Sequence, residues 1–181
     1  PTPRYEHVGP SGRFRDVYEP AEDTFLLLDA LERDAAQLRQ AGYAQQAAVE
    51  KAGWGTCHTG TNNLQCFALR CTDINPMAAY CTLETAQLNN VHLQPVITDL
   101  VQSHGIEASW AGGKKGREVM DRVFPLVADL LSTGGLFYLV TIKENNPDEI
   151  LETMTKHGLE GTRLLSRQAG QEMLTILKFR K

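Results

Sequence analysis

The chain lacks long apolar runs and a disulfide framework. Within its 181 residues no stretch approaches the length of a membrane-spanning helix, and residues 1–14 carry no apolar signal segment. Its four cysteines include no Cys-x-x-Cys pair. Such a sparse set is typical of reduced thiols, so we expect a cytoplasmic or nuclear protein that has no contact with a membrane.

Basic charge and metal-ligand spacings are also scarce. The net charge of -4 provides no attraction toward nucleic acid, which makes a protein or a small molecule the better-fitting partner. The five histidines are scattered, and their spacings to the cysteines match no ordinary zinc pattern, so we expect no metal site. No Ser-His-Asp order or nucleophile elbow indicates a serine hydrolase.

What the sequence does contain is an alternation of helical and strand patterns. Apolar spacing and helix-start signals predict helices over residues 21–40, 77–88, 117–131 and 147–157. Short apolar runs predict strands over 65–72, 94–98 and 136–140 and a closing hairpin of 162–167 and 173–179. This order predicts a single α/β domain with a doubly wound, mostly parallel sheet and an antiparallel C-terminal hairpin.

Two segments do not fit that plan. Residues 1–15 are polar, and we expect a flexible N-terminus there. Residues 41–64 contain no Val/Ile/Leu-rich run, although the first, central strand of such a sheet should lie there and be covered on both faces. We therefore expect 41–64 to be irregular.

Two acids follow predicted strands. Asp73 comes directly after the run that begins at Cys66, and an acid at a strand end is how an open α/β sheet grips a ribose diol. The alternative role, capping the next helix, suits Asn75 better because it immediately precedes Pro76. Asp99 follows a second short strand. The sequence supports two roles for it about equally, a contact with the cofactor and a solvated acid in a loop.

Two glycine-containing stretches could serve a cofactor, but each fits an ordinary loop better. Gly53-Trp54-Gly55 follows no apolar strand. The Gly112-Gly113-Lys114-Lys115-Gly116-Arg117 stretch precedes a helix but lacks the spacing of a P-loop. We expect a turn with solvated basic residues there.

Longer motifs make the chain recognisable. Asp16-Val-Tyr-Glu-Pro-Ala-Glu-Asp-Thr24 and Cys71-Thr-Asp-Ile-Asn-Pro76 resemble the HemK-type class I methyltransferases, particularly the eukaryotic release-factor glutamine methyltransferases. Members of that group are also described as N6-adenine DNA and histone lysine methyltransferases. The resemblance extends over nearly everything after Leu69, including Gly135-Leu-Phe-Tyr-Leu-Val-Thr-Ile-Lys-Glu-Asn-Asn-Pro147.

The resemblance implies a Rossmann-like enzyme that uses S-adenosylmethionine. It implies that Asp73 holds the ribose hydroxyls, that Asp99 and Leu100 flank the adenine, and that Thr24 approaches the cofactor from the first helix. It further implies glutamine-N5 methylation of a translation release factor, histone lysine as a second substrate, and a heterodimer with a small zinc-binding activator subunit.

Two elements of that family are missing. One is the strand with a Glu-x-Gly-x-Gly-type loop, in whose place residues 41–64 stand. The other is the Asn-Pro-Pro-Tyr substrate clamp, which is absent near residues 100–104, so no catalytic residue carries over. A catalytically impaired splice-type variant that retains only partner binding therefore stays an alternative. A nicotinamide-dependent oxidoreductase is a weaker alternative, because a dinucleotide needs a glycine loop more than a cofactor without phosphate groups does.

Overall fold

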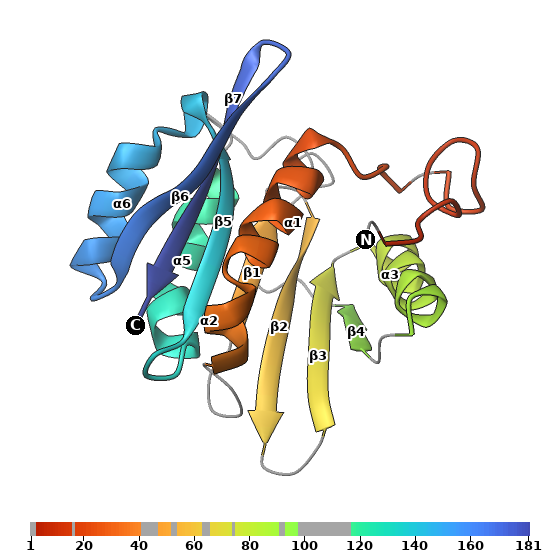
Figure 1. Cartoon of the computed structure of the whole chain (residues 1–181), viewed down its shortest axis with the longest axis horizontal. Coiled ribbons are helices and arrows are strands. Elements are labelled where there is room, and N and C mark those ends of the chain that lie inside the picture. The colour runs from red at the N-terminus through yellow and green to blue at the C-terminus, as the bar shows by residue number, and fades with distance from the viewer. Residues whose placement is uncertain are drawn as a thin grey trace.

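In the described part of the chain, a seven-stranded sheet has helices on both of its faces (Figure 1). The computed structural model describes residues 3–15, 17–40, 47–51, 54–62, 66–73, 75–90, 93–97 and 117–181. The described helices are α1 (Glu22–Arg33), α2 (Ala35–Gln40), α3 (Pro76–Leu88), α5 (Glu118–Leu130) and α6 (Pro147–Lys156), with a 3-10 turn, η2 (Lys143–Asn145). The strands are β1 (Ala47–Lys51), β2 (Trp54–Asn62), β3 (Cys66–Asp73), β4 (Leu93–Ile97), β5 (Leu136–Ile142), β6 (Glu160–Ala169) and β7 (Glu172–Arg180).

The strand order is β4-β3-β2-β1-β5-β7-β6. β3 pairs in parallel with β4, and β1 pairs in parallel with β5, whereas β2 runs antiparallel to both of its neighbours. β6 and β7 form the predicted antiparallel hairpin, with β7 pairing antiparallel to β5. The fold therefore belongs to the predicted α/β class. In the middle of the sheet, the strand β2 runs opposite to its two neighbours.

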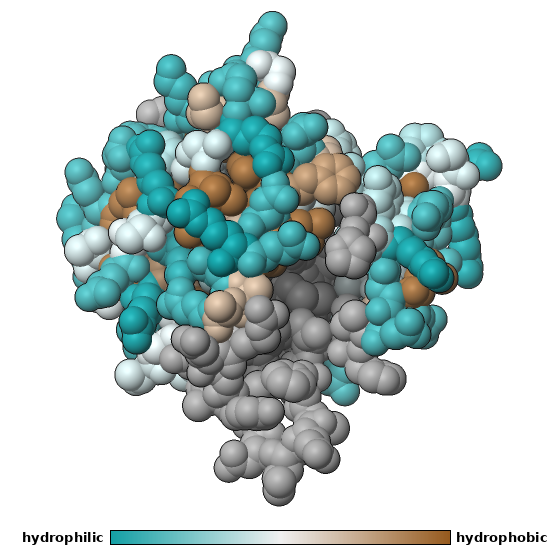
Figure 2. Space-filling model, viewed as in Figure 1, coloured by the Kyte–Doolittle hydropathy of each residue, from teal (hydrophilic) through white to brown (hydrophobic). Residues whose placement is uncertain are grey.

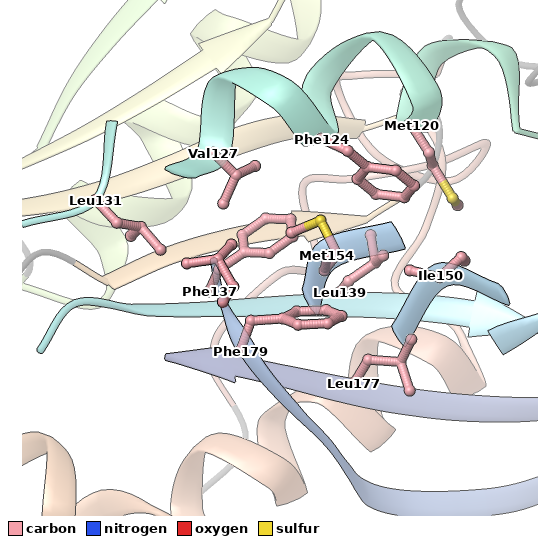
Figure 3. Close-up of a cluster of buried hydrophobic side chains, with 11 residues drawn as sticks. Met120, Phe124, Val127, Leu131, Phe137, Leu139, Ile150, Met154, Leu177 and Phe179 are labelled. Atoms are coloured by element: carbon pink, nitrogen blue, oxygen red, sulfur yellow. The ribbon is translucent and has the colours of Figure 1, made fainter. Parts of the chain in front are cut away.

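Strand β5 is the centre of the hydrophobic core because its side chains are buried on both faces. On one face Phe137 and Leu139 pack with Phe124 of α5 and Ile150 of α6. Figure 3 shows Phe124 pointing from α5 toward β5. The ring of Phe137 stacks on Phe179 of β7 at a centroid distance of 5.9 Å. Burial on both faces is why the run in β5 is apolar up to Thr141, apart from the hydroxyl of Tyr138.

Helix α1 covers the other face. Its buried residues Leu26 and Ala30 pack against Leu136, Tyr138 and Val140 of β5. Figure 2 shows that the outer surface over α1 and the C-terminal hairpin is mostly hydrophilic. α1 is thus an amphipathic helix that buries only its sheet-facing stripe.

The predicted helix over 21–40 is divided at Asp34 into α1 and α2, yet its hydrogen bonding continues. The Asp34 N–H donates to the Ala30 carbonyl at 3.1 Å, and the Leu38 N–H donates to the Asp34 carbonyl at 2.8 Å. The other predicted helices and strands agree with the structure within a few residues at each end.

The N-terminal segment differs from the expectation of flexibility. Val8, Phe14 and Val17 are buried in a small cluster with Cys81 of α3. Polar contacts add to this packing, since His7 Nε2 lies 2.8 Å from Thr85 Oγ1. Apolar side chains spaced among polar residues anchor the segment, a pattern too sparse to read as regular structure.

The expectation of an irregular 41–64 segment is corrected by β1 and β2, which together cover residues 47–51 and 54–62. Trp54 and Gly55, expected in a loop, begin β2. These strands lie between β3 and β5, where both neighbours supply backbone hydrogen bonds. Ladder pairing in the middle of a sheet overrides the weak strand propensity of this segment.

Candidate functional site

The carboxyl ends of four strands meet at one edge of the sheet. β2 runs antiparallel to β1 and to β3, so β1 and β3 point the same way, and their parallel partners β5 and β4 follow them. Ligands of open α/β sheets bind in the crevice outside this edge. The sites predicted from the sequence must therefore be placed relative to it.

Asp73 is the last residue of β3 and is paired in register with Ile97, the last residue of β4. The neighbouring cap is provided by Asn75, as predicted, because its Oδ1 accepts from the Met77 N–H at 2.9 Å. The side chain of Asp73 lies outside the described residues, as do Asp99 and Leu100 entirely. The roles of these three in cofactor binding stay predictions, but the backbone puts Asp73 at the correct edge.

Thr24 also reaches this edge. Asp29 of α1 pairs with Arg167, whose register partner Leu174 is in turn paired with Ile142, the end of β5. At the other end of α1, Asp34 bonds to Tyr138, nearer the start of β5. Thr24 lies five residues before Asp29, about 7.5 Å further along the helix at 1.5 Å per residue, on the side of Asp29 away from Asp34.

The contacts of Thr24 fix the first turn of α1. Its N–H donates to Asp23 Oδ1 at 2.8 Å, and its Oγ1 accepts from the Ala21 N–H at 3.4 Å. The acids Glu22 and Asp23 lie in this first turn, where they interact favourably with the positive end of the helix dipole. Local hydrogen bonds therefore hold the turn that the resemblance assigns to the cofactor.

Arg117 corrects one prediction. Sequence reasoning placed it among solvated basic residues, but it is buried and pairs with Asp121 at 2.7 Å and with Glu149 at 2.9 Å. The contact with Asp121 could have been predicted from the sequence, because Asp121 follows Arg117 by four residues in a predicted helix. The Glu149 contact had none, because it joins two different helices.

A pocket lies between the N-terminal segment and α3. This pocket has a volume of about 460 Å³ and is lined by Phe14, Tyr80 and Glu84, among others. Arg13 pairs with Glu84 there at 3.1 Å, and both side chains are accessible.

In the described part of the chain, no three His, Cys, Asp or Glu side chains gather closely enough to hold a metal ion. None of the described helices combines the length and the apolar character needed to span a bilayer.

Solved structures with related folds are class I methyltransferases. The Mtq2-Trm112 complex of E. cuniculi is 23% identical, with a TM-score of 0.52, over 91% of this chain and 98% of that one. The T. thermophilus 16S rRNA N2 G1207 methyltransferase, solved with AdoMet and guanosine, is 18% identical with a TM-score of 0.59, over 90% of this chain and 44% of that one. At these identities the likeness shows the fold, a Rossmann-like class I methyltransferase.

No family model matches the chain. Curated relatives are nevertheless close over nearly its whole length. The human protein named methyltransferase HEMK2 is 54% identical over 99% of this chain and 96% of its own, and the mouse protein of that name is 53% identical over 100% and 97%. The eRF1 methyltransferase catalytic subunit mtq2 of Schizosaccharomyces pombe is 31% identical over 91% of this chain and 89% of its own.

The alignment with the human relative spans 208 positions, 27 more than the 181 residues of this chain. The relative therefore carries positions that have no counterpart here. Identity at this level over the full length shows common descent despite those gaps. The chain belongs to the HEMK2 family of HemK-type methyltransferases.

Proposed function

We propose that the chain is an S-adenosylmethionine-dependent protein methyltransferase that modifies a glutamine of a translation release factor at N5. The observation that carries this proposal is the full-length similarity to the fission yeast protein named as an eRF1 methyltransferase catalytic subunit. Histone lysine is a second candidate acceptor, supported by the motif resemblance alone. Both acceptors are proteins, in keeping with the acidic charge of the chain.

The residues at the carboxyl edge suit such a cofactor. β3 ends in Asp73, and the adjacent helix is capped by Asn75, so the acid is not required as the cap of α3. Thr24 lies in the first turn of α1. Asp73 would hold the ribose hydroxyls, Asp99 and Leu100 would flank the adenine, and Thr24 would approach the cofactor from α1. The cofactor itself supplies an already activated methyl group, so the protein has mainly to bind and orient.

A small activator subunit, zinc-binding by the motif resemblance, is the proposed partner. The E. cuniculi relative was solved with Trm112. In this chain β4 is the end strand of the described sheet, and Val96 and Ile97 on it are 39% and 53% exposed. Helix α3, which packs beside β4, adds Met77 and Tyr80, 47% and 59% exposed. An end strand next to exposed apolar side chains is a surface that natural proteins cover.

A second candidate function is partner binding without efficient catalysis. Two observations favour it: the alignment with the human relative is 27 positions longer than this chain, and the sequence contains no Asn-Pro-Pro-Tyr motif. Such a chain would retain the α3–β4 surface and lose the groups that hold the acceptor nitrogen.

A tritiated-methyl assay separates the two. The chain is mixed with the activator subunit, the release factor and labelled S-adenosylmethionine, and label on the release-factor glutamine is counted. Replacing that glutamine by asparagine in the acceptor is the control, because it should abolish labelling. Label above this control supports the enzyme; a stable heterodimer without label supports the binding-only reading.

A further inference from the structure

A buried arginine joins α5 and α6, the two helices that pack on the same face of β5. Arg117, at the start of α5, donates from Nη2 to Asp121 Oδ1 at 2.7 Å and places Nη1 2.9 Å from Glu149 Oε2 in the first turn of α6. A buried guanidinium requires such partners because its desolvation is costly. The pair therefore fixes the beginning of α6 against the beginning of α5.

Glu149 extends this connection to the turn that precedes α6. The same Oε2 atom accepts from Asn146 Nδ2 at 3.0 Å. Asn146 has φ 54° and ψ 72°, a left-handed conformation that is unfavourable for a residue with a Cβ. The Asn146 N–H also donates to the Lys143 carbonyl at 3.0 Å. A strained conformation persists only when its surroundings hold it, and Arg117 and Glu149 are part of that support.

A second set of contacts holds the same turn from the strand side. Asn145 is buried, and its Oδ1 accepts from the Ile142 N–H at 2.8 Å. Pro147, also buried, begins α6. Residues 143–146 are thus fixed at both ends, while the side chains of Lys143 and Glu144 are exposed.

The turn lies at the edge that carries the candidate site. β5 ends at Ile142 and β3 ends at Asp73, and the two strands point the same way with β1 and β2 between them. Three strand spacings put the turn about 14 Å along the edge from the end of β3. The turn and the end of β3 therefore lie along the same edge, outside which ligands of open α/β sheets bind, so a protein acceptor bound there can contact the turn.

We propose that Arg117 is a positioning residue for the protein acceptor: through Glu149 and Asn146 it fixes the 143–146 turn, against which the acceptor docks during methylation. The inference rests on the proposed function and adds the part of the edge that the acceptor contacts. The exposed pair Lys143 and Glu144 fits a polar, charged acceptor surface. A turn held in its docking shape binds with less loss of conformational freedom.

Neighbouring acids in the first turn of α6 offer a matched test. Glu149→Gln and Asp148→Asn each remove one negative charge from that turn, so their effects on the helix dipole are equal in kind. Of these two acids, Glu149 contacts Arg117, whereas Asp148 forms an exposed ion pair with Arg163. Arg117→Lys keeps the charge but loses the two-pronged guanidinium. Asn146→Gly keeps the left-handed backbone and loses the side-chain bond.

The variants are assayed as heterodimers with the activator subunit. We expect Glu149→Gln to raise the KM for the release factor about tenfold, with kcat and the affinity for S-adenosylhomocysteine unchanged. Arg117→Lys and Asn146→Gly should fall between it and the native chain, and Asp148→Asn should match the native chain. Hydrogen exchange at the Ile142 and Asn146 amides should be faster in Glu149→Gln than in Asp148→Asn.

The outcomes are distinguishable. If Glu149→Gln and Asp148→Asn have the same KM while the native chain methylates, the inference is wrong and the proposed function stands. A proportional loss of kcat, acceptor affinity and cofactor affinity with a lowered Tm would show a merely structural role, and also overturns it. If the native heterodimer neither binds nor methylates the release factor, the proposed function fails, and the docking role falls with it whatever the exchange rates show.

Discussion

The phenol of Tyr138 donates a 2.7 Å hydrogen bond to Asp34 Oδ2, joining the middle of β5 to the junction of α1 and α2. Lys178 of β7 pairs with the same carboxylate oxygen at 2.5 Å. All three side chains are largely buried, so the carboxylate exchanges water for two protein donors. This polar network fixes α1, and with it the first turn that carries Thr24, on the sheet.

Removing the phenol should destabilise the chain and change its response to alkaline pH. Tyr138→Phe deletes a hydrogen bond to a charged group, which costs about 1.5–3 kcal/mol at neutral pH. Burial, and then the bond and charge of Asp34, raise the pKa of Tyr138. Because the neutral phenol is favoured in the folded state, Tyr138 stabilises the fold at any pH below its pKa in the unfolded chain, which is about 10. This stabilisation is lost as the pH rises above that value.

Thermal unfolding between pH 7 and 11 measures both effects. The native Tm should fall more steeply above pH 10 than that of Tyr138→Phe, which has no phenol to ionise at this position. Tyr80→Phe is the control, since that side chain is 59% exposed. Parallel curves for native protein and Tyr138→Phe would contradict the assignment.

Cofactor affinity should depend on Asp73. Asp73→Ala removes a charge-assisted bond to the ribose and should weaken binding of S-adenosylhomocysteine by about 1.5–3 kcal/mol, measured by isothermal titration. Asn75→Ala is the matched control, because Asn75 lies two residues after Asp73 and caps α3. Its loss should cost about 1 kcal/mol of stability without weakening cofactor binding. Equal affinities for native protein and Asp73→Ala would make the acid structural.

The sequence predicted the strands that carry strong apolar periodicity and the helices that carry caps. β5, buried on both faces, and α3, with Asn75 and Pro76 at its start, are the plainest cases. β1 and β2 were missed because sheet neighbours, not their own residues, impose their conformation. The Arg117–Glu149 pair was missed because no local pattern reports a contact between separate helices.

Burial also revises where the chain exposes apolar surface. From the sequence alone, a sheet missing two strands would expose two apolar helix faces, Phe25/Leu28/Leu31 and Phe124/Leu126/Val127. Phe124 and Val127 are instead buried, at 1% and 4% exposure, because β5, β7 and α6 cover them. Phe25, Leu28 and Leu31 are half-buried, and Leu126 is 43% exposed. The apolar side chains that stay open include Tyr80 and Ile97, beside the end strand β4.

We therefore expect the activator subunit to bind at β4 and to stabilise the chain. Adding it should raise the Tm in proportion to the logarithm of its concentration. Ile97→Glu should weaken the heterodimer at least about tenfold, since a buried unpaired charge is strongly unfavourable. Leu126→Glu is the control: Leu126 is 43% exposed but lies on α5. A sharp, high and concentration-independent unfolding transition of the chain alone, unchanged by the subunit, would contradict this expectation.

Catalysis should be limited by the missing substrate clamp. In the family that the motifs resemble, an Asn-Pro-Pro-Tyr segment holds the acceptor amide; here Gln102-Ser103-His104 stands in its place, and His104 is the nearest Asp or His that could substitute for it. Without a partner for its hydrogen atoms, the acceptor nitrogen is not held with its lone pair toward the methyl group. Orientation supplies several kcal/mol of such barriers, so we expect methylation at least about a hundredfold slower than in a chain with the segment restored.

The comparison uses the chain as it is and a chain into which the missing segments of the human relative are inserted. Each is assayed with the activator subunit and release factor, with titration of S-adenosylhomocysteine alongside. If the clamp is the missing part, insertion raises kcat more than it raises cofactor affinity, because the clamp acts on the acceptor. Replacing the inserted Asn by Ala should return the rate to that of the uninserted chain. Equal rates with and without the insertion would show that another group orients the acceptor, and His104→Ala would then test the nearest one.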